Sequence, residues 1–272
     1  MDSTDALLDQ VVEVCPLPAT TQRVLALTSS DTSSVPEVAK VISTDPALAA
    51  AVMSVANSAA YGMGKIDRIE VAVMRLGLRE LNKLAAAMAL FAAFRNKAEL
   101  TLPLHEMCVA SGAIAHRIAK ESNLAQPGTA FVCGLLSEIG AMCCLVFDGT
   151  NYVQLWEQAG ESIDLRAELE RTRYGATSFA IGQRFLERNS LPETVYRAVG
   201  SDLTQSPELA DPLAKITLLA RHTPRLARAA NNDATQLFAL LDGLAQRVAL
   251  TGVDGARLLG FWAQASASPE LS

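Results

Sequence analysis

Apolar residues recur every three or four positions along most of this chain, and the two-residue alternation typical of half-buried strands is nearly absent. One stripe of this kind comprises Leu81, Leu84, Ala85, Met88, Phe91 and Ala92. Another, near the C-terminus, comprises Leu237, Leu240, Leu241, Leu244 and Val248. Because this spacing gathers side chains on one face of a helix, where they can pack against a core, the pattern predicts an all-α fold built as a multi-helix bundle.

Polar residues followed by proline mark where several helices begin. Ser34-Val35-Pro36-Glu37 is a capping box with proline in the first turn, and Ser190-Leu191-Pro192-Glu193 repeats it. Asp45-Pro46 and Asp211-Pro212 supply two further starts, in which an aspartate can accept hydrogen bonds from the first free backbone N–H groups. The sequence therefore predicts helices directly after each of these four motifs.

Domain boundaries are weakly marked, because no Gly/Ser-rich linker divides the chain and no period of 20 to 50 residues repeats. We expect a helical lead-in over residues 1–13 and a compact domain over residues 14–205. A C-terminal helical extension over residues 206–265 and a disordered tail over residues 266–272 complete the expected organisation. The Leu237 to Val248 stripe can either cover the bundle or form a homodimer contact.

Charge argues against broad binding of nucleic acid. The chain carries 23 Lys and Arg against 29 Asp and Glu, a formal net charge of −6, and no run of basic residues is long enough to neutralise several phosphates in a row. We therefore expect a protein that binds neither nucleic acid nor an anionic membrane surface.

The N-terminal sequence MDSTDALLDQ has acidic residues where a signal peptide needs basic ones. No stretch offers the roughly 18 uninterrupted apolar residues that a membrane-spanning helix requires. We therefore expect a cytoplasmic protein that is not inserted in a membrane.

One polar pair, Ser137-Glu138, lies inside the apolar stretch FVCGLLSEIGAMCCLVF, residues 131–147, which we expect to be helical. A carboxylate in such surroundings is unfavourable unless it is paired, hydrogen-bonded or protonated. The pair is therefore the first candidate for a functional site.

Several stretches resemble the HDOD family, the output-domain relatives of the HD phosphohydrolases in bacterial signalling proteins. They are CPLPATTQRVLAL, VAKVISTDPALAAAVMSVANSAAYG, IEVAVMRLGLRELNKLAAAMAL, AFVCGLLSEIGAMCCL and RYGATSFAIGQRFLERNSLPETVYRAV, within residues 14–205. The resemblance implies an HD-like helical bundle with a C-terminal helical extension. Its signature residues in the first half are Asp45, Asn57, Ser58, Tyr61 and Gly77, which either close helix ends or form a contact surface for a partner.

The same resemblance implies where a metal site would lie. The central His-Asp pair of an HD phosphohydrolase aligns with Ser137-Glu138, the upstream histidine with Met107, the downstream one with Ser178, and the late histidine pair with Asp202-Leu203. Every imidazole ligand is missing, so we expect a degenerate site without a catalytic residue, metal or other cofactor. Glu138 is then either a remnant ligand or a buried carboxylate held by an arginine or by helix-terminal amides.

The three histidines of the chain do not replace the missing ligands. His105 and His116 are eleven residues apart on one expected helix, about 16 Å at 1.5 Å per residue, so one metal ion cannot join them. His222 lies in RHTPRLAR, which we interpret as a solvated helix end.

The sequence thus predicts a non-catalytic signalling protein that acts through protein–protein interaction. The expected partner is another signalling protein, in pathways of the cyclic-di-GMP or two-component kind that the resemblance implies. Two alternatives stay open: a metal-dependent phosphohydrolase with atypical ligands that acts on nucleotides, and a sensor that binds a nucleotide or other small molecule in the vacant site.

Overall fold

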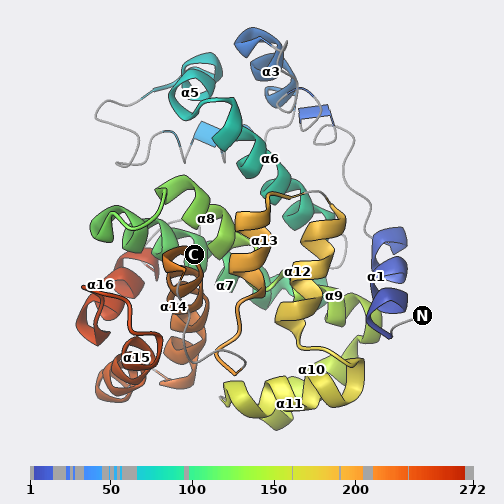
Figure 1. The fold of residues 1–272 in the computed structure, drawn as a ribbon, viewed down its shortest axis with the longest axis vertical. Coiled ribbons are helices and arrows are strands. Elements are labelled where there is room, and N and C mark those ends of the chain that lie inside the picture. The colour runs from blue at the N-terminus through green and yellow to red at the C-terminus, as the bar shows by residue number, and fades with distance from the viewer. Residues whose placement is uncertain are drawn as a thin grey trace. The chain divides into compact units, whose positions relative to one another are not determined.

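The structure is a computed structural model, and it describes residues 3–14, 23–24, 27, 34–44, 49, 52–53, 56, 66–94, 98–160, 162–189, 191–204, 211–231 and 233–266. Within these residues the regular elements are helices and no strand occurs, which confirms the all-α prediction (Figure 1). The chain divides into two compact units, Cys15–Asn96 and the combination of Met1–Val14 with Lys97–Ser272. The predicted boundary at residue 13 lies one residue before the division after Val14, and the predicted boundary at residue 205 lies within the segment Lys97–Ser272.

The unit Cys15–Asn96 contains α3 (Val35–Ile42), α5 (Ile69–Leu76) and α6 (Leu78–Ala93), in which α5 packs against both of the others. The predicted capping box begins α3: Ser34 precedes the helix, and its Oγ accepts a hydrogen bond from the Glu37 backbone N–H at 3.4 Å. Gly77 separates α5 from α6 with φ = 76°, a backbone conformation that glycine adopts without strain. The other predicted signature residues, Asp45, Asn57, Ser58 and Tyr61, lie outside the described residues.

The larger unit is a helical assembly whose longest element is α7 (Ala98–Ser122). Its other described helices are α1 (Ser3–Val14), α8 (Pro127–Leu135), α9 (Ile139–Asp148), α10 (Thr150–Ala159), α11 (Ile163–Tyr174), α12 (Ser178–Arg188), α13 (Glu193–Gly200), α14 (Pro212–Ala229), α15 (Ala234–Val248) and α16 (Gly255–Ser266). α7 packs against α8 and α14, and α12 packs against α9 and α13. α14 also packs against α8, and α1 packs against α9, so helices from both ends of the unit's sequence contact this central pair.

The apolar stretch 131–147, expected as one helix, is divided into α8 and α9 by a turn that contains Ser137, and Glu138 is the N-cap residue of α9. Glycines on either side of the turn allow close helix packing. A Cβ atom added to Gly140 would lie 1.8 Å from the carbonyl oxygen of Ser178, and one added to Gly134 would lie 2.4 Å from that of Ser111. The break thus allows both apolar halves to pack closely against neighbouring helices and places Glu138 between them.

One described segment, Pro127–Asp148, is long and apolar enough to cross a membrane by length and composition. It combines α8 and α9, and 83% of its most apolar 18-residue window is buried inside the fold. Buried core helices of soluble proteins satisfy the same criterion, so the segment is weak evidence for a span.

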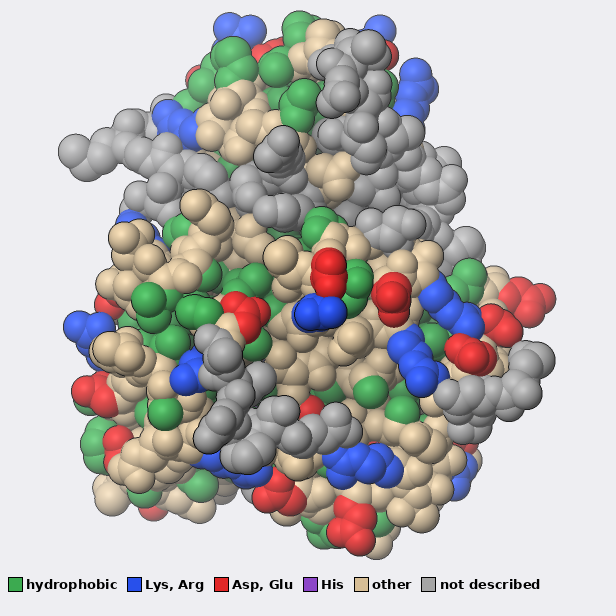
Figure 2. Space-filling view, viewed as in Figure 1, with side chains coloured by type: hydrophobic (Ala, Val, Ile, Leu, Met, Phe, Trp, Pro, Cys, Tyr) green, Lys and Arg blue, Asp and Glu red, His purple; other side chains and the backbone are tan. Residues whose placement is uncertain are grey.

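The C-terminal helices belong to the same compact unit as α7 to α13. α14 starts after Asp211, whose Oδ1 accepts a hydrogen bond from the Leu213 N–H, as predicted. It packs against α7, α8 and α13, while α15 packs against α14 and α16. The predicted stripe of α15 is buried at Leu237, Leu241, Leu244 and Val248 and half-buried at Leu240. On the face seen in Figure 2, basic and acidic side chains of the described residues are interspersed.

Candidate functional site

Three buried side chains meet around the guanidinium group of a fourth, Arg166, in the larger unit. Arg166 and Glu170 lie one turn apart on α11, Glu138 precedes α9, and Ser178 is the first residue of α12. All four are at most 2% exposed. We call this cluster the arginine centre.

Arg166 binds the other three members of the arginine centre directly. Its Nη2 donates to Glu138 Oε2 at 3.1 Å and to Ser178 Oγ at 2.9 Å, and its Nε donates to Glu170 Oε1 at 2.8 Å. Glu170 also accepts from the Ser178 backbone N–H at 2.6 Å and from the Tyr152 hydroxyl at 2.7 Å. The guanidinium group therefore joins three helix segments, and Glu170 is shared between a cation and two neutral donors.

Glu138 stays ionised because of the guanidinium groups around it. Burial raises the pKa of this carboxyl, but the charges of Arg166, Arg225 and Arg221 together hold its pKa below the ordinary value of 4.5. The pKa of Arg166 is raised in turn, since its loss of solvation is outweighed by the surrounding oxygens of Tyr152, Glu170 and Glu138. The interpretation of Glu138 as a buried carboxylate held by an arginine is confirmed.

Two further arginines on α14 extend this charge cluster and contact the same aromatic rings as Arg166. Arg221 lies over the Phe179 ring at 4.4 Å, and Arg225 lies over the Trp156 ring at 4.8 Å from the ring centroid. Arg166 faces the same two rings, at 5.3 and 4.7 Å. Aromatic faces attract cations, so the rings stabilise guanidinium groups whose charges would otherwise repel one another.

Arg221 also binds backbone at the end of α13. It donates to the carbonyl oxygens of Val199 and Ser201, the latter at 3.0 Å. These carbonyls lie in the last turn of the helix and just beyond it, where backbone acceptors have no intrahelical partner. Desolvation nevertheless lowers the pKa of Arg221 to about 10, and that of Arg225 also to about 10.

Three other predicted site positions, Met107, Ser137 and Asp202, are not members of the arginine centre. Met107 on α7 is 5% exposed and lines the cavity described below. Ser137 is buried, and its Oγ has no hydrogen-bond partner among the described residues. Asp202 faces elsewhere: it accepts from Arg171 Nη2 at 3.2 Å and from the backbone N–H and side chain of Thr204.

A family model, the HDOD domain, matches residues 14–202. This chain belongs to the HDOD domain family. The resemblance inferred from the sequence is therefore confirmed. No curated protein matches the sequence.

Solved HDOD-like structures have the same fold. An HDOD domain protein of unknown function from Geobacter sulfurreducens is 21% identical with a TM-score of 0.66, and the match covers 97% of this chain and 96% of that one. A candidate phosphohydrolase from Shewanella amazonensis SB2B is 22% identical with a TM-score of 0.66, over 95% and 93% of the two chains. A candidate signal transduction protein from Marinobacter aquaeolei VT8 is 20% identical with a TM-score of 0.56, over 98% of this chain and 62% of that one. At these identities the likeness establishes the fold alone.

The side chains at the HD-like positions of this HDOD protein do not fit a divalent metal. Met107 offers a thioether, Ser137 and Ser178 offer hydroxyls, and the two carboxylates, Glu138 and Asp202, are paired with Arg166 and Arg171. Hard or borderline divalent ions prefer several carboxylate or imidazole ligands. Among the described residues, no group of three or more His, Cys, Asp or Glu side chains is placed to hold a metal ion. Two of these positions, Glu138 and Ser178, bind the Arg166 guanidinium instead.

The interpretation of His222 as a solvated helix end is wrong. α14 is packed against α7, α8, α13, α15 and α16, so His222 is fully buried, and its ring stands edge-on to Phe179 at 6.2 Å between centroids. Burial lowers its pKa, and the nearby Arg221, Arg225, Arg166 and Arg247 lower it further. His222 is therefore neutral at physiological pH.

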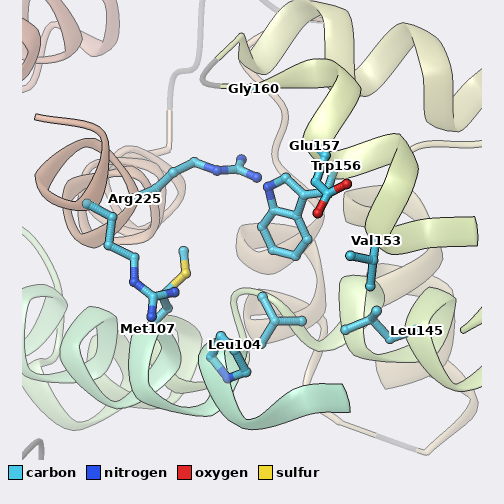
Figure 3. Close-up of a pocket in the computed structure, with 10 residues that line it drawn as sticks. Leu104, Met107, Leu145, Val153, Trp156, Glu157, Gly160 and Arg225 are labelled. Carbon is cyan, nitrogen blue, oxygen red and sulfur yellow. The ribbon is translucent and has the colours of Figure 1, made fainter. Parts of the chain in front are cut away.

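A cavity of about 350 Å³ opens next to the arginine centre, lined by Pro103, Leu104, Met107, Leu145, Val153, Trp156, Glu157, Gly160, Arg225 and Arg228. We call it the Trp156 cavity. Figure 3 shows the Arg225 side chain reaching across from α14 toward the Trp156 indole, with Leu104 and Met107 of α7 on the opposite wall. Its volume is within the range of small-molecule sites.

The arginines of the site were missed at the level of sequence. Arg166 and Glu170 are four residues apart, as are Arg221 and Arg225, and such spacing marks a shared helix face. That signal was available, but charged residues at this spacing are most often solvated. Only the packing of α11 and α14 into the unit shows that these faces point inward.

Proposed function

We propose that this HDOD domain protein is a non-catalytic regulatory module that acts by binding another signalling protein. The observation that carries the proposal is the arginine centre, in which the Arg166 guanidinium lies between Glu138, Glu170 and Ser178.

An HD phosphohydrolase depends on a metal ion to generate a nucleophile from water and to neutralise charge on the phosphoryl group. A guanidinium group carries charge but cannot lower the pKa of a water molecule by coordinating it. Because the pKa of Arg166 is raised, the group is also unable to act as a base. The chemistry of the residues therefore supports binding over hydrolysis.

Regulation through a partner protein is supported by the family and by this loss of ligands. The candidate signal transduction protein from Marinobacter aquaeolei VT8 has the same fold, and its name is consistent with a regulatory role. We propose a cytoplasmic location and a partner from a cyclic-di-GMP or two-component pathway. The net charge of −6 supports a protein partner over nucleic acid.

Hydrolysis assays test the non-catalytic part of the proposal. The purified chain is incubated with Mn²⁺, Mg²⁺, Fe²⁺ or Zn²⁺ and with cyclic dinucleotides, (p)ppGpp or bis-p-nitrophenyl phosphate. We expect turnover no higher than that of the Glu138→Gln variant. Turnover that Glu138→Gln abolishes and Glu168→Gln, an exposed glutamate on α11, retains would establish the rival phosphohydrolase.

Crosslinking and capture from the native cell, with the full chain as bait, test the partner part. We expect one regulatory protein to be enriched specifically, and its complex to re-form from purified components. Failure to enrich any specific protein would favour a small-molecule sensor over a protein-binding module.

A further inference from the structure

The Trp156 cavity combines apolar walls with one buried cationic group, Arg225. Leu104, Met107 and Leu145 are buried side chains that line it, and Trp156 presents its indole ring. Arg225 is only 5% exposed and contributes its side chain to the same lining. An apolar cavity with a few convergent polar groups is the usual form of a small-molecule site.

Polar atoms at this side of the cavity lack partners. Arg225 Nη2 is buried, and no hydrogen-bond acceptor lies within reach of it among the described residues. The same is true of Arg166 Nη1, beyond the Trp156 ring that both guanidinium groups face. A buried charged donor without an acceptor is unfavourable by more than a neutral one, so Arg225 is a group that a ligand can satisfy.

The carboxylates of the buried cluster are engaged away from Arg225. Glu138 and Glu170 are bound to Arg166, and the third buried carboxylate, Asp202, is bound to Arg171. No carboxylate is paired with Arg225 among the described residues. The cavity wall therefore carries a buried guanidinium group without an ion-pair partner.

Charge and shape together define the ligand. We propose that the Trp156 cavity binds a small organic monocarboxylate, whose carboxylate pairs with Arg225 and whose apolar body lies against Trp156, Leu104 and Met107. One negative charge matches the unpaired guanidinium group of Arg225, and a carboxylate matches the fork of two N–H donors that arginine presents. Such a ligand would make the HDOD module sensitive to a metabolite, which goes beyond the proposed function. The proposal rests on that function in one respect: the ligand regulates the protein and is not hydrolysed by it.

Two charged residues at the rim modulate this binding. Arg228 is about half exposed and lies 3.6 Å from Glu106, so its charge is already paired in part. Glu157 is exposed and contributes a negative charge to the lining. We therefore expect Arg225 to provide most of the attraction for a carboxylate, and Glu157 to weaken it.

Fluorescence of Trp156 gives a local readout. The chain has two tryptophans, and the other, Trp262, lines a smaller cavity that shares Met107 and Arg228. In a Trp262→Phe background, Trp156 is the sole indole reporter. The probes are 4-phenylbutyrate, octanoate and indole-3-acetate, with 4-phenylbutanol and octanol as uncharged counterparts and acetate as a head group without a body.

Binding is measured by titration calorimetry and melting temperature in the Trp262→Phe background with EDTA present. For 4-phenylbutyrate and octanoate, quenching of Trp156 fluorescence is followed as well; indole-3-acetate, which itself fluoresces, is followed by the first two methods. Because EDTA removes metal, the result is independent of the hydrolysis assays. We expect at least one of the three carboxylates to bind saturably at millimolar concentration or below and to raise the melting temperature. Its uncharged counterpart, or indole-3-ethanol for indole-3-acetate, should bind about tenfold more weakly, and acetate should not bind measurably.

Three variants assign the effect to the cavity. Arg225→Met should weaken binding of the carboxylate about tenfold and leave the affinity for the alcohol unchanged. Glu157→Gln should strengthen binding of the carboxylate. Arg197→Gln, at an exposed arginine that pairs with Glu193 on α13, should leave the affinities for the acid and the alcohol unchanged. The proposal is overturned if none of the three carboxylates binds, if each alcohol binds as well as its acid, or if folded Arg225→Met binds the acid like the parent. If Arg225→Met does not fold, Glu157→Gln decides alone: affinity for the acid that does not rise overturns the proposal.

Discussion

Replacing Arg166 by methionine removes the one cation that Glu138 and Glu170 share. Both carboxylates are at most 1% exposed, and in the variant Glu138 keeps no hydrogen-bond donor among the described residues. Glu170 keeps the Tyr152 hydroxyl and the Ser178 N–H. Glu138 must therefore take up a proton or remain as an unpaired buried charge.

The expected loss of folding stability follows from these contacts. Breaking a buried ion pair by removal of one partner lowers the free energy of unfolding by about 3–5 kcal/mol. The lost hydrogen bond to Ser178 and the contacts with Trp156 and Phe179 increase this loss, while protonation of Glu138 reduces it. We expect a net loss of about 4 kcal/mol at neutral pH, a large share of the roughly 5–15 kcal/mol that holds a typical domain folded.

The loss of folding stability in Arg166→Met should depend on pH. Without Arg166, burial raises the folded-state pKa of Glu138 above its unfolded value, so the folded state binds a proton more tightly than the unfolded one. Stability of the variant then increases as pH falls toward the unfolded pKa. The difference between parent and variant should accordingly be larger at pH 8 than at pH 5.

Urea unfolding followed by circular dichroism measures these differences. Arg188→Met is the matched control, since Arg188 also contacts two carboxylates, Asp5 and Asp9, but on the exposed surface, where the loss should stay below about 1 kcal/mol. Adding Glu138→Gln to Arg166→Met should recover about 1–2 kcal/mol. An Arg166→Met loss no larger than that of Arg188→Met, or one that is the same at both pH values, would show that Arg166 does not hold Glu138 and Glu170 as a buried ion pair.

Two further predictions use other parts of the larger unit. Gly140→Ala places a Cβ atom 1.8 Å from the Ser178 carbonyl oxygen and should destabilise the fold by about 3 kcal/mol or more. Gly243→Ala lies inside α15 with nothing within 4 Å of the new atom, and it should stabilise the fold by about 0.5–1 kcal/mol. Thermal or urea unfolding measures both changes. Equal effects of the two substitutions would contradict the packing of α9 against α12. The folded-state pKa of His222 is lowered from 6.5, so the unfolded chain takes up the proton first and stability falls by up to about 1.4 kcal/mol per pH unit below pH 6.5. Unfolding at pH 7 and pH 5 should show that His222→Leu reduces this slope, and an unchanged slope would show that His222 is not buried as described.

Sequence reasoning was most successful where a local pattern determines local structure. Ser34 and Asp211 act at the predicted helix starts because a side-chain oxygen two or three residues from a free N–H is a local arrangement. The second capping box failed: α13 begins at Glu193 after Pro192, and Ser190 lies outside the described residues. A capping motif indicates that a helix is near, but tertiary packing selects its first residue.

The family resemblance indicated where the site lies but not that arginine side chains form it. Family resemblance located Met107, Ser137, Glu138 and Ser178, and the structure brings Glu138 and Ser178 to the same nitrogen of Arg166. Neither Arg166 nor the arginines of α14 belong to that pattern, because burial of a charge depends on which distant helices cover it. The turn at Ser137 escaped notice for the same reason, since the composition of residues 131–147 suits a continuous apolar helix.

Titration with Mn²⁺ followed by electron paramagnetic resonance tests directly whether Arg166 takes the place of a metal ion in this protein. If it does, the EDTA-treated chain should leave the signal of free Mn²⁺ unchanged up to millimolar concentration, and Glu138→Gln should behave in the same way. Stoichiometric loss of the free Mn²⁺ signal at micromolar concentration, abolished by Glu138→Gln, would contradict this role of Arg166.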